Sequence, residues 1–443
     1  MKTISDQAIQ VIDLVRAAGA SGDLIIDQGE SLSLKATDGE LEEYKVSSSQ
    51  IFGLRVIKDG KVGTAYSEAV DSDALSSLVD QALTNASFTA IEVHENILAN
   101  DANLKTDDSV LCPAEDVSID EKINFALQME SDLAARDKVK NVPYNSVQDN
   151  TSQRHIFSSA GLSAYSKNRM CAAYAYALIE DGDKNAMEGV GQAARLFAAL
   201  DVNDIVDRAY TQAIDILDGS PVPSGHYDVI FDEEVQASLF GVFAMMFSGK
   251  SAKDGVNPMR EKLGEAIADT RLSITDQPLN ADGFGYQFFD AEGTATQSTP
   301  LIVDGTLSTL IHNSATASFF DMKTTGHAAR GPKSTMGVRL HQLEIVAGSG
   351  SQADLFSDKY LMLTDLTGMH SGANAISGDF SFGASGFLYQ DGQRVQPVRG
   401  VTVAGNFYDM LNKIALIGDK QFWNWERSAL MPHLRFTDIA ISG

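Results

Sequence analysis

Apolar residues along this 443-residue chain follow two different periods, and the changes between them mark out helices and strands. Helical spacing predicts helices over residues 8–18, 71–86, 120–136 and 203–217. Alternation with a period of two predicts an antiparallel meander over residues 24–65, in which Asp38-Gly39 and Asp59-Gly60 are strong hairpin signals. The same alternation returns over residues 139–195 and predicts further long strands.

The clearest linker is Pro221-Val-Pro-Ser-Gly225, because two prolines and a glycine separate a completed helix from a new strand. We place a domain boundary there, which gives an N-terminal domain of residues 1–220 and a glycine-rich C-terminal domain of residues 221–443. The chain is long enough for two domains with sizeable cores. The predicted fold class is α+β, with mostly antiparallel sheet packed with helices in each domain.

Residues 227–249 read as a short strand that leads directly into a helix. Asp232 is the expected N-cap, and Ser248-Gly249 is the expected stop. Between Ala237 and Phe247 every residue except Ser238 is apolar or glycine, which predicts a helix buried on all sides. No titratable side chain follows Glu234 in this helix, so it offers neither an acid–base group nor a metal ligand.

Sixty acidic residues against thirty-four basic ones give a formal charge of −26, which argues against direct binding of a nucleic acid. No apolar run reaches the roughly 18 residues that a transmembrane helix needs. The first residues are amphipathic and differ from a secretory signal. The two cysteines, Cys112 and Cys171, lie far apart in the sequence and offer neither a disulfide framework nor a zinc knuckle. A reducing cytoplasm is therefore the expected compartment.

Neither a metal site nor a nucleophile is indicated by spacing. No two of the eight histidines lie within five residues of each other, so no helical turn carries a zinc-binding pair, although distant ligands could converge in space. His370-Ser371 and the sequence GASGF at residues 383–387 are better explained as structural turns or strand. Residues 368–405 are rich in glycine, a composition typical of a curved sheet or of a sheet edge that accepts a peptide strand.

Several long motifs resemble the TldD/PmbA family, once called modulators of DNA gyrase and now regarded as metalloprotease-related. They are FDAEGTAT at residues 289–296, TTGHA at residues 324–328 and HSGANAISGDFSFGASGFLYQDG at residues 370–392. They occur in the family's order, and the resemblance covers essentially the whole chain, including the N-terminal meander.

The family has two branches that pair in a heterodimeric protease. The TldD branch binds zinc through His-Glu-x-x-x-His on the helix after the first strand of its second domain, together with a cysteine near the C-terminus. At the corresponding positions this chain has Phe240, Gly241 and Met245, and its C-terminal segment contains no cysteine. The resemblance is therefore to the PmbA branch, also called TldE, which lacks these ligands.

The resemblance implies a zinc-free, PmbA/TldE-like subunit of a cytoplasmic TldD/TldE-type metalloprotease, with zinc expected in the partner subunit and no cofactor in this chain. It implies a heterodimer, or a homodimer in isolation, that acts on unfolded peptides. No catalytic residue is assigned. The residues expected in the family-like loops near the substrate are His327, His370, Asn374, Asp379 and Ser381. For each of them a capping or turn-forming role is the alternative.

Two other functions stay open at this stage. The chain could be a peptidase in its own right that gathers a metal from dispersed histidines and carboxylates. It could instead be a non-proteolytic regulator that acts by binding. A sister chain carrying His-Glu-x-x-x-His in the same genome would favour the subunit role.

Overall fold

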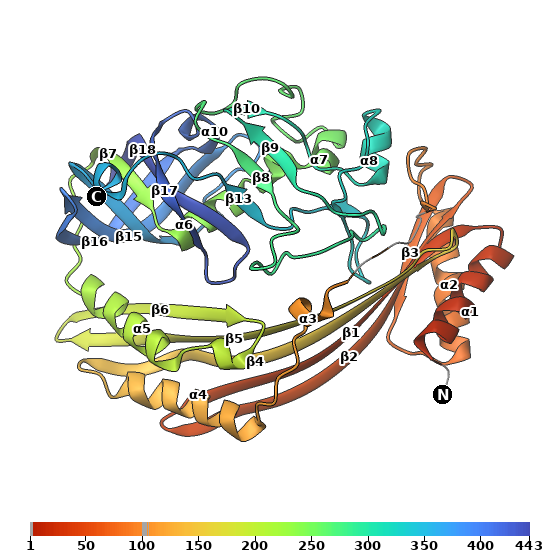
Figure 1. Cartoon of the computed structure of the whole chain (residues 1–443), viewed down its shortest axis with the longest axis horizontal. Coiled ribbons are helices and arrows are strands. Elements are labelled where there is room, and N and C mark those ends of the chain that lie inside the picture. Colours follow the sequence, from red (N-terminus) through yellow and green to blue (C-terminus); the bar gives the residue numbers. More distant parts are fainter. Residues whose placement is uncertain (1–2, 100–103, 105) are drawn as a thin grey trace.

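A computed structural model describes residues 3–99, 104 and 106–443, and its first half is built on one six-stranded sheet (Figure 1). The strand order is β3-β2-β1-β4-β5-β6, and every neighbouring pair is antiparallel. The strands are β1 (Ser21–Thr37), β2 (Glu40–Lys58), β3 (Lys61–Ser67), β4 (Val139–Ser158), β5 (Ser163–Asp181) and β6 (Lys184–Ala194). The sheet is long and curved, and its concave face is turned toward the second half of the molecule (Figure 1).

The predicted meander is confirmed, and its two Asp-Gly pairs form the turns. Asp38 and Gly39 have φ values of 53° and 76°, and Asp59 and Gly60 have φ values of 52° and 73°. Positive φ at both central residues is the requirement of a two-residue type I′ hairpin. The strands are longer than predicted, because the mostly polar residues 45–50 of β2 keep their pairing with β1.

The helices predicted in this half are confirmed, and they pack on the outer face of the sheet. They are α1 (Ile4–Ala17), α2 (Ser72–Ser87), α4 (Ile119–Ala134) and α5 (Val202–Ile216), with the short α3 (Asp108–Leu111) and η1 (Phe197–Ala199). Apolar residues of α1 and α2 form one core with β1–β3, and those of α4 and α5 form another with β4–β6. In β5, Ala173, Ala175 and Ala177 are buried in the second core, which leaves Tyr174 and Tyr176 on the concave face.

In the second half five strands close into a ring. β7 pairs in parallel with β14 and antiparallel with β18, and β14, β15, β16 and β18 complete the ring through antiparallel pairs. The strands are β7 (Gly225–Phe231), β8 (Ile274–Asp276), β9 (Thr299–Val303), β10 (Thr306–Leu307), β11 (Ala328–Ala329), β12 (Gly337–Val338), β13 (Leu343–Ile345), β14 (Lys359–Thr367), β15 (Asp379–Gln390), β16 (Gln393–Asn406), β17 (Ile414–Trp423) and β18 (Ala429–Ser442). The predicted fold class, α+β with mostly antiparallel sheet, is therefore confirmed.

The helices of the second half are mostly short. They are α6 (Glu233–Val242), η2 (Ala244–Phe247), α7 (Gly249–Lys253), α8 (Ser314–Phe319), α9 (Gln352–Leu355) and α10 (Phe407–Met410). None of the described helices combines the length and the apolar character that a bilayer-spanning helix needs.

The prediction that residues 237–247 form one helix buried on all sides is wrong in two respects. The α-helix ends at Val242, and residues 244–247 form a 3₁₀ turn. Ser238 and Gly241 are exposed, and a Cβ built on Gly241 would have open space around it. The apolar pattern misled because glycine and alanine carry too little side chain to reveal which face of a helix is open.

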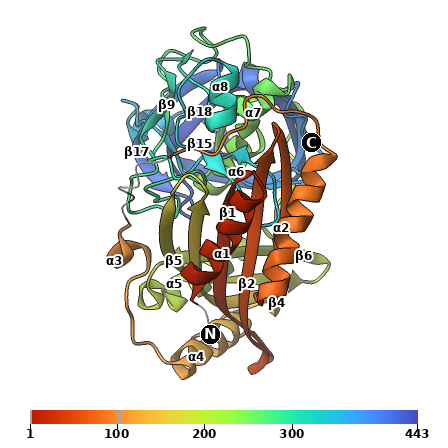
Figure 2. The same ribbon diagram turned by 90° about the vertical axis from the view of Figure 1, so that its right-hand side faces the viewer.

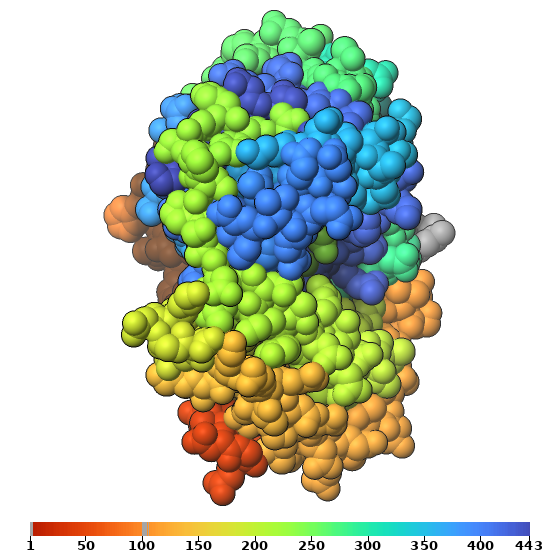
Figure 3. Space-filling model, turned by 90° about the vertical axis from the view of Figure 1, so that its left-hand side faces the viewer, coloured from red at the N-terminus to blue at the C-terminus, as the bar shows by residue number. Residues whose placement is uncertain are grey.

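The two halves meet along the concave face of the six-stranded sheet. Figure 2 shows α1 and α2 beside the strands at one end of this sheet, and Figure 3 shows the segment that follows α5 rising along the opposite end into the second half. This segment is anchored, because the backbone N–H of Ser220 donates to the carbonyl of Pro397.

Candidate functional site

A cavity of about 690 Å³ lies between the concave face of the sheet and helix α6. Strands β4–β6 and helix α5 supply one wall, and α6, β14 and the β17–β18 loop supply the other. The main lining side chains are Tyr144, Tyr174, Tyr176, Glu188, Arg208, Asp232, Glu234, Ser238, Asp365, Met369 and Trp425.

Helix α6 is held by polar contacts at its first turns. The side chain of Asp232 accepts a hydrogen bond from the backbone N–H of Val235 at 2.8 Å and caps the helix, as predicted. The buried Gln236 donates to the carbonyl of Pro432 at 2.9 Å and accepts from the N–H of Leu434 at 3.2 Å, which ties α6 to β18. These contacts fix the rotation of the helix about its axis, and thus the residues that face the cavity.

The three residues that the sequence analysis placed at the zinc-motif positions lie in different environments. Phe240 is 3% exposed and packs edge-on against Phe407. Gly241 lies on the same stripe of α6 as Glu234 and Ser238, which line the cavity, but it has no side chain to offer. Met245 is half-buried in the 3₁₀ turn. Phenylalanine and glycine provide no metal-binding atom, and a thioether is a soft ligand that does not suit zinc, so these residues do not fit the metal.

Carboxyl groups gather in the cavity without enough cations to balance them. Burial, followed by the charge of Asp365, raises the pKa of Glu188 to about 7, and Arg399 opposes this shift only in part. Burial, together with Glu233 and Glu426, raises the pKa of Glu234 to about 7. Burial also raises the pKa of Asp232 and of Asp365. Near neutral pH the cavity therefore contains partly protonated carboxyl groups, which can both donate and accept hydrogen bonds.

Two glycines of β6 let aromatic rings lie flat against this edge of the sheet. A Cβ on Gly189 would lie 2.3 Å from Cγ of Tyr176, and a Cβ on Gly191 would lie 2.9 Å from Cε3 of Trp425. The rings and the carboxyl groups together form a surface that suits an extended peptide, with apolar area for side chains and polar groups for the backbone.

The residues predicted near the substrate lie in two separate places. His327 has no exposed surface and lies in the interior of the second half. His370, Asn374, Asp379 and Ser381 are exposed, and they lie in or beside the turn that leads into β15. There Asn374 Oδ1 accepts from the N–H groups of Ile376 and Ser377, and the carboxylate of Asp379 accepts from the side chains of Ser377 and Asn406.

One group of dispersed residues converges in a way that could hold a metal ion. The ligand atoms of Asp276, His327 and His341 all lie within 4.8 Å of one another, and they are the one such group that we find among the residues described. Both histidines share Asp276 Oδ2, with distances of 2.9 Å to His327 Nε2 and 2.8 Å to His341 Nδ1. Asp276 Oδ1 accepts from the N–H groups of His341 and Gln342.

These hydrogen bonds already use most of the atoms that a metal would need. His327 Nδ1 lies 2.9 Å from the carbonyl oxygen of Thr325, so both of its ring nitrogens face acceptors. In this structure the group is a hydrogen-bonded network that joins β8 to the loops before β11 and β13. The sequence did not reveal this group because its members are far apart along the chain. Strands β11 and β12 lie between His327 and His341, and Asp276 lies in the earlier strand β8.

Comparison with known proteins decides the family. Three family models match consecutive parts of the chain, described as the PmbA/TldA metallopeptidase domain 1 (residues 22–86), central domain (residues 112–217) and C-terminal domain (residues 224–443). The chain belongs to the PmbA/TldD family.

Relatives of this PmbA/TldD protein match along nearly its whole length. The chain is 26% identical over 429 residues to the metalloprotease PmbA of Escherichia coli O157:H7, which covers 94% of this chain and 92% of the relative. A PmbA homologue of Haemophilus influenzae is 26% identical over 425 residues, which covers 92% of this chain and 89% of the relative.

Two solved structures share the fold. A Thermotoga maritima protein described as a modulator of a DNA gyrase is 25% identical, with a TM-score of 0.89 and coverage of 99% of this chain and 100% of the other. TldE of Thermococcus kodakarensis is 21% identical, with a TM-score of 0.86 and coverage of 98% and 100%.

Proposed function

We propose that this PmbA/TldD protein is a zinc-free, PmbA/TldE-like subunit that supports proteolysis of unfolded peptides by a zinc-bearing, TldD-like partner in the cytoplasm. The observation that carries the proposal is the composition of helix α6 at the motif positions. Phe240 is buried in the core and packs against Phe407. Gly241 is on the open face of α6 but has no side chain that could bind a metal. A metal-binding pair is absent from the helix that supplies it in the TldD branch.

The cavity above α6 supports a role in holding peptide. Its tyrosines and Trp425 offer flat apolar surfaces to peptide side chains. Its carboxyl groups can donate or accept hydrogen bonds with a peptide backbone. Among the residues that line it there is no serine, cysteine or histidine arranged as a nucleophile and base; Ser238 stands on α6 with no histidine in the lining. Binding without chemistry is the function that these groups support.

A partner could bind along the free part of strand β2. β3 covers only residues 52–58 of β2, and residues 40–51 have no strand on that side among the described residues. Tyr44 is 49% exposed and Val46 is 65% exposed on this segment. An open strand edge with exposed apolar side chains is a common template for strand addition by another chain.

The second candidate function, a peptidase in its own right, would depend on Asp276, His327 and His341. Their convergence favours it, since it brings dispersed ligands together. Two observations speak against it. The ligand atoms of Asp276 and His327 already make hydrogen bonds. Neither side chain has exposed surface through which a substrate could reach a bound ion.

The test is peptide cleavage by the isolated chain and by its mixture with a TldD-type protein that carries His-Glu-x-x-x-His. We expect no cleavage of an unstructured peptide by the isolated chain. In the mixture we expect cleavage that a chelator abolishes, above the level of the TldD-type protein alone. Hydrolysis by the isolated chain would contradict the proposal and favour the second candidate. No gain over the TldD-type protein alone would remove the supporting role.

A further inference from the structure

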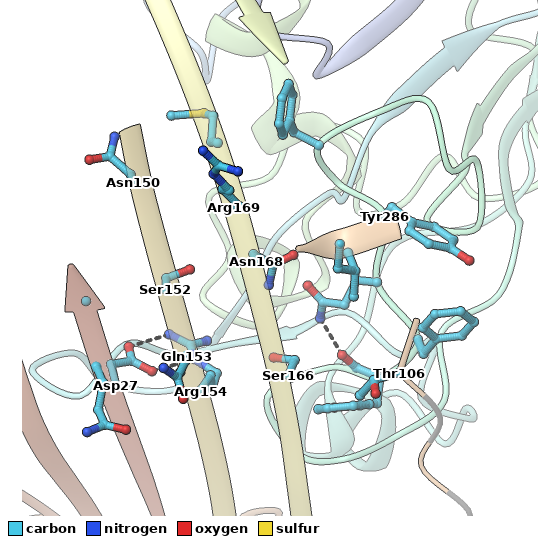
Figure 4. Close-up of a pocket in the computed structure, with 18 of the residues that line it drawn as sticks. Asp27, Thr106, Asn150, Ser152, Gln153, Arg154, Ser166, Asn168, Arg169 and Tyr286 are labelled. Atoms are coloured by element: carbon cyan, nitrogen blue, oxygen red, sulfur yellow. Dashed lines mark hydrogen bonds and ion pairs between the residues drawn. The ribbon is translucent and has the colours of Figure 1, made fainter. Parts of the chain in front are cut away.

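Two connected cavities lie on the same concave face of the six-stranded sheet, further along β4 and β5 from α6. The larger, of about 580 Å³, lies between β1, β4, β5 and the loop of residues 284–291. Figure 4 shows Asn150, Ser152 and Arg154 along β4 and Ser166 and Asn168 along β5, opposite the loop that carries Tyr286. The smaller cavity, of about 290 Å³, adjoins it through Arg154, Gln287, Ala291 and Arg339, which line both.

Three arginine residues lie around the smaller cavity. Arg154, Arg330 and Arg339 line it together with His341 and Ser334, and no carboxylate is among its lining residues. This is unexpected in a chain with a formal net charge of −26. Arg154 and Arg330 are paired with carboxylates, and Arg339 has no such partner among the described residues.

Each of the three arginines has a different degree of pairing. Arg154 is fully paired, with bonds of 2.8 and 2.7 Å from its Nε and an Nη atom to the carboxylate of Asp27. The side chain of Arg330 has no exposed surface, and its Nη atoms donate to the carboxylate of Asp23 and to the carbonyl of Gly53. Its Nε is buried without a hydrogen-bond acceptor. Arg339 is exposed, and its guanidinium has no carboxylate partner among the residues that the structure describes.

An imidazole completes the polar wall. His341 Nδ1 is bound to Asp276 at 2.8 Å, so Nε2 is the ring nitrogen left for a ligand in the cavity.

The larger cavity adds Arg195 and a lining suited to a peptide chain. Arg195 is half-buried and donates to the carbonyls of Leu111 and Gly283, at 3.3 and 2.9 Å, with its guanidinium 4.9 Å from the centre of the Phe284 ring. The side chains that could hydrogen-bond a peptide backbone are Asn150, Ser152, Gln153, Ser166 and Asn168. Phe284, Tyr286 and Phe288 supply apolar surface for its side chains.

We propose that these cavities bind a peptide through a carboxylate, which sits in the smaller cavity against Arg339 while the neighbouring peptide residues lie in the larger one. The inference rests on the proposed peptide-handling function and names the chemistry of the ligand. Planar carboxylates match the fork of a guanidinium, and such charge-assisted bonds are stronger than neutral ones. A nucleic acid is disfavoured, since the net charge of the chain repels a polyanion.

The carboxylate could come from the C-terminus of the peptide or from an aspartate or glutamate side chain. Three fluorescent ten-residue unstructured peptides distinguish these sources. The first has a free C-terminus and no acidic side chain, the second has an amidated C-terminus and one central glutamate, and the third is amidated with glutamine in place of that glutamate. Fluorescence anisotropy with the isolated full chain at low salt measures each affinity.

We expect the first or second peptide to bind about tenfold more tightly than the third, as a charged hydrogen bond allows. Arg339→Gln should abolish this preference, and Arg260→Gln, a partly exposed arginine outside both cavities, should preserve it. Because Arg339 is exposed, its variant is expected to fold normally, which circular dichroism checks. A second variant, Arg195→Gln, should weaken all three peptides.

Equal affinity for the three peptides would overturn the proposal, and so would a preference that survives Arg339→Gln. Displacement of the bound peptide by inorganic phosphate below millimolar concentration would also overturn it, because the site would then be one for small oxyanions. This assay needs neither zinc nor a partner. Loss of cleavage in the mixture with intact peptide binding would therefore contradict the subunit role alone.

Discussion

The ring of Phe240 stands edge-on to the ring of Phe407, with centroids 5.2 Å apart and planes at 87°. Phe407 in turn stacks on Phe243 at 4.5 Å, so Phe240, which is predicted to stand at the first position of the zinc motif, belongs to an aromatic cluster in the core. A side chain in that position stabilises the fold and is unavailable to a ligand in the cleft.

Truncation of this ring should therefore be costly. We expect Phe240→Ala to lower the free energy of unfolding by about 3–5 kcal/mol, because it leaves a cavity among packed aromatic rings. Phe88→Ala is the matched control, since Phe88 is 85% exposed and its loss should change stability little. Urea unfolding measures both. A cost for Phe240→Ala close to that of Phe88→Ala would mean that the ring is not part of the core.

The open face of α6 reverses an expectation drawn from the sequence. A helix enclosed on all sides would be overpacked by any side chain at residue 241, but Gly241 has open space at its Cβ position. Gly241→Ala should therefore stabilise the protein by up to about 1 kcal/mol through helix propensity. The matched substitution Gly191→Ala should destabilise it by about 1–3 kcal/mol, because the new Cβ would meet the ring of Trp425. The thermal midpoints of the two variants and of the wild type provide the test. A lower midpoint for Gly241→Ala than for the wild type would show that this face of α6 is closed.

Restoring the sister motif in α6 should fail to produce a zinc enzyme. The variant Phe240→His/Gly241→Glu/Met245→His would lose the ring that packs against Phe407, and residue 245 would lie in a 3₁₀ turn after the α-helix has ended. We expect a destabilised protein with no peptidase activity. Its thermal midpoint with and without zinc, and a cleavage assay, test this. Zinc-dependent stability together with hydrolysis would contradict our account of α6.

The carboxyl groups of Glu188 and Asp365, which both line the cavity beside α6, predict that the stability of the protein depends on pH. Because the pKa of Glu188 is raised to about 7 in the folded protein, the folded state holds its proton more tightly than the unfolded state. This contribution is stabilising at low pH and is lost as the pH rises from about 4.5 to about 7.

Asp365→Asn removes a like charge that helps to raise this pKa. Relative to the wild type, the variant should become progressively more stable as the pH rises from 5 to 7. Glu43→Gln, on the exposed part of β2, is the control and should leave the shape of the profile unchanged. Thermal midpoints between pH 5 and 8 provide the comparison. A constant difference between Asp365→Asn and the wild type would show that the two carboxyl groups do not interact.

Local features of the fold were predictable from the sequence, and long-range ones were not. Asp-Gly turns and helix caps act over a few residues, so the N-terminal meander and the helix start at Asp232 could be inferred from neighbours alone. The closure of the ring by β7 between β14 and β18 joins segments more than 130 residues apart, and no local pattern encodes it.

The same limit applies to the candidate site. The prediction that α6 lacks a zinc motif followed from the resemblance to the family, which placed residues 240, 241 and 245 at the motif positions, and from the side chains found there. The cleft draws Glu188 and Asp365 from different sheets, and each carboxylate is unremarkable in its own segment. Their proximity, like the convergence of His327 and His341 on Asp276, depends on how the two halves of the chain pack.

The most direct test of the zinc-free assignment is the metal content of the purified chain, measured by elemental analysis after dialysis at neutral pH. The account predicts much less than one zinc per chain, with the same content in the variant His341→Ala. One tightly held zinc per chain would contradict it, and loss of that zinc in His341→Ala would place the metal at Asp276, His327 and His341.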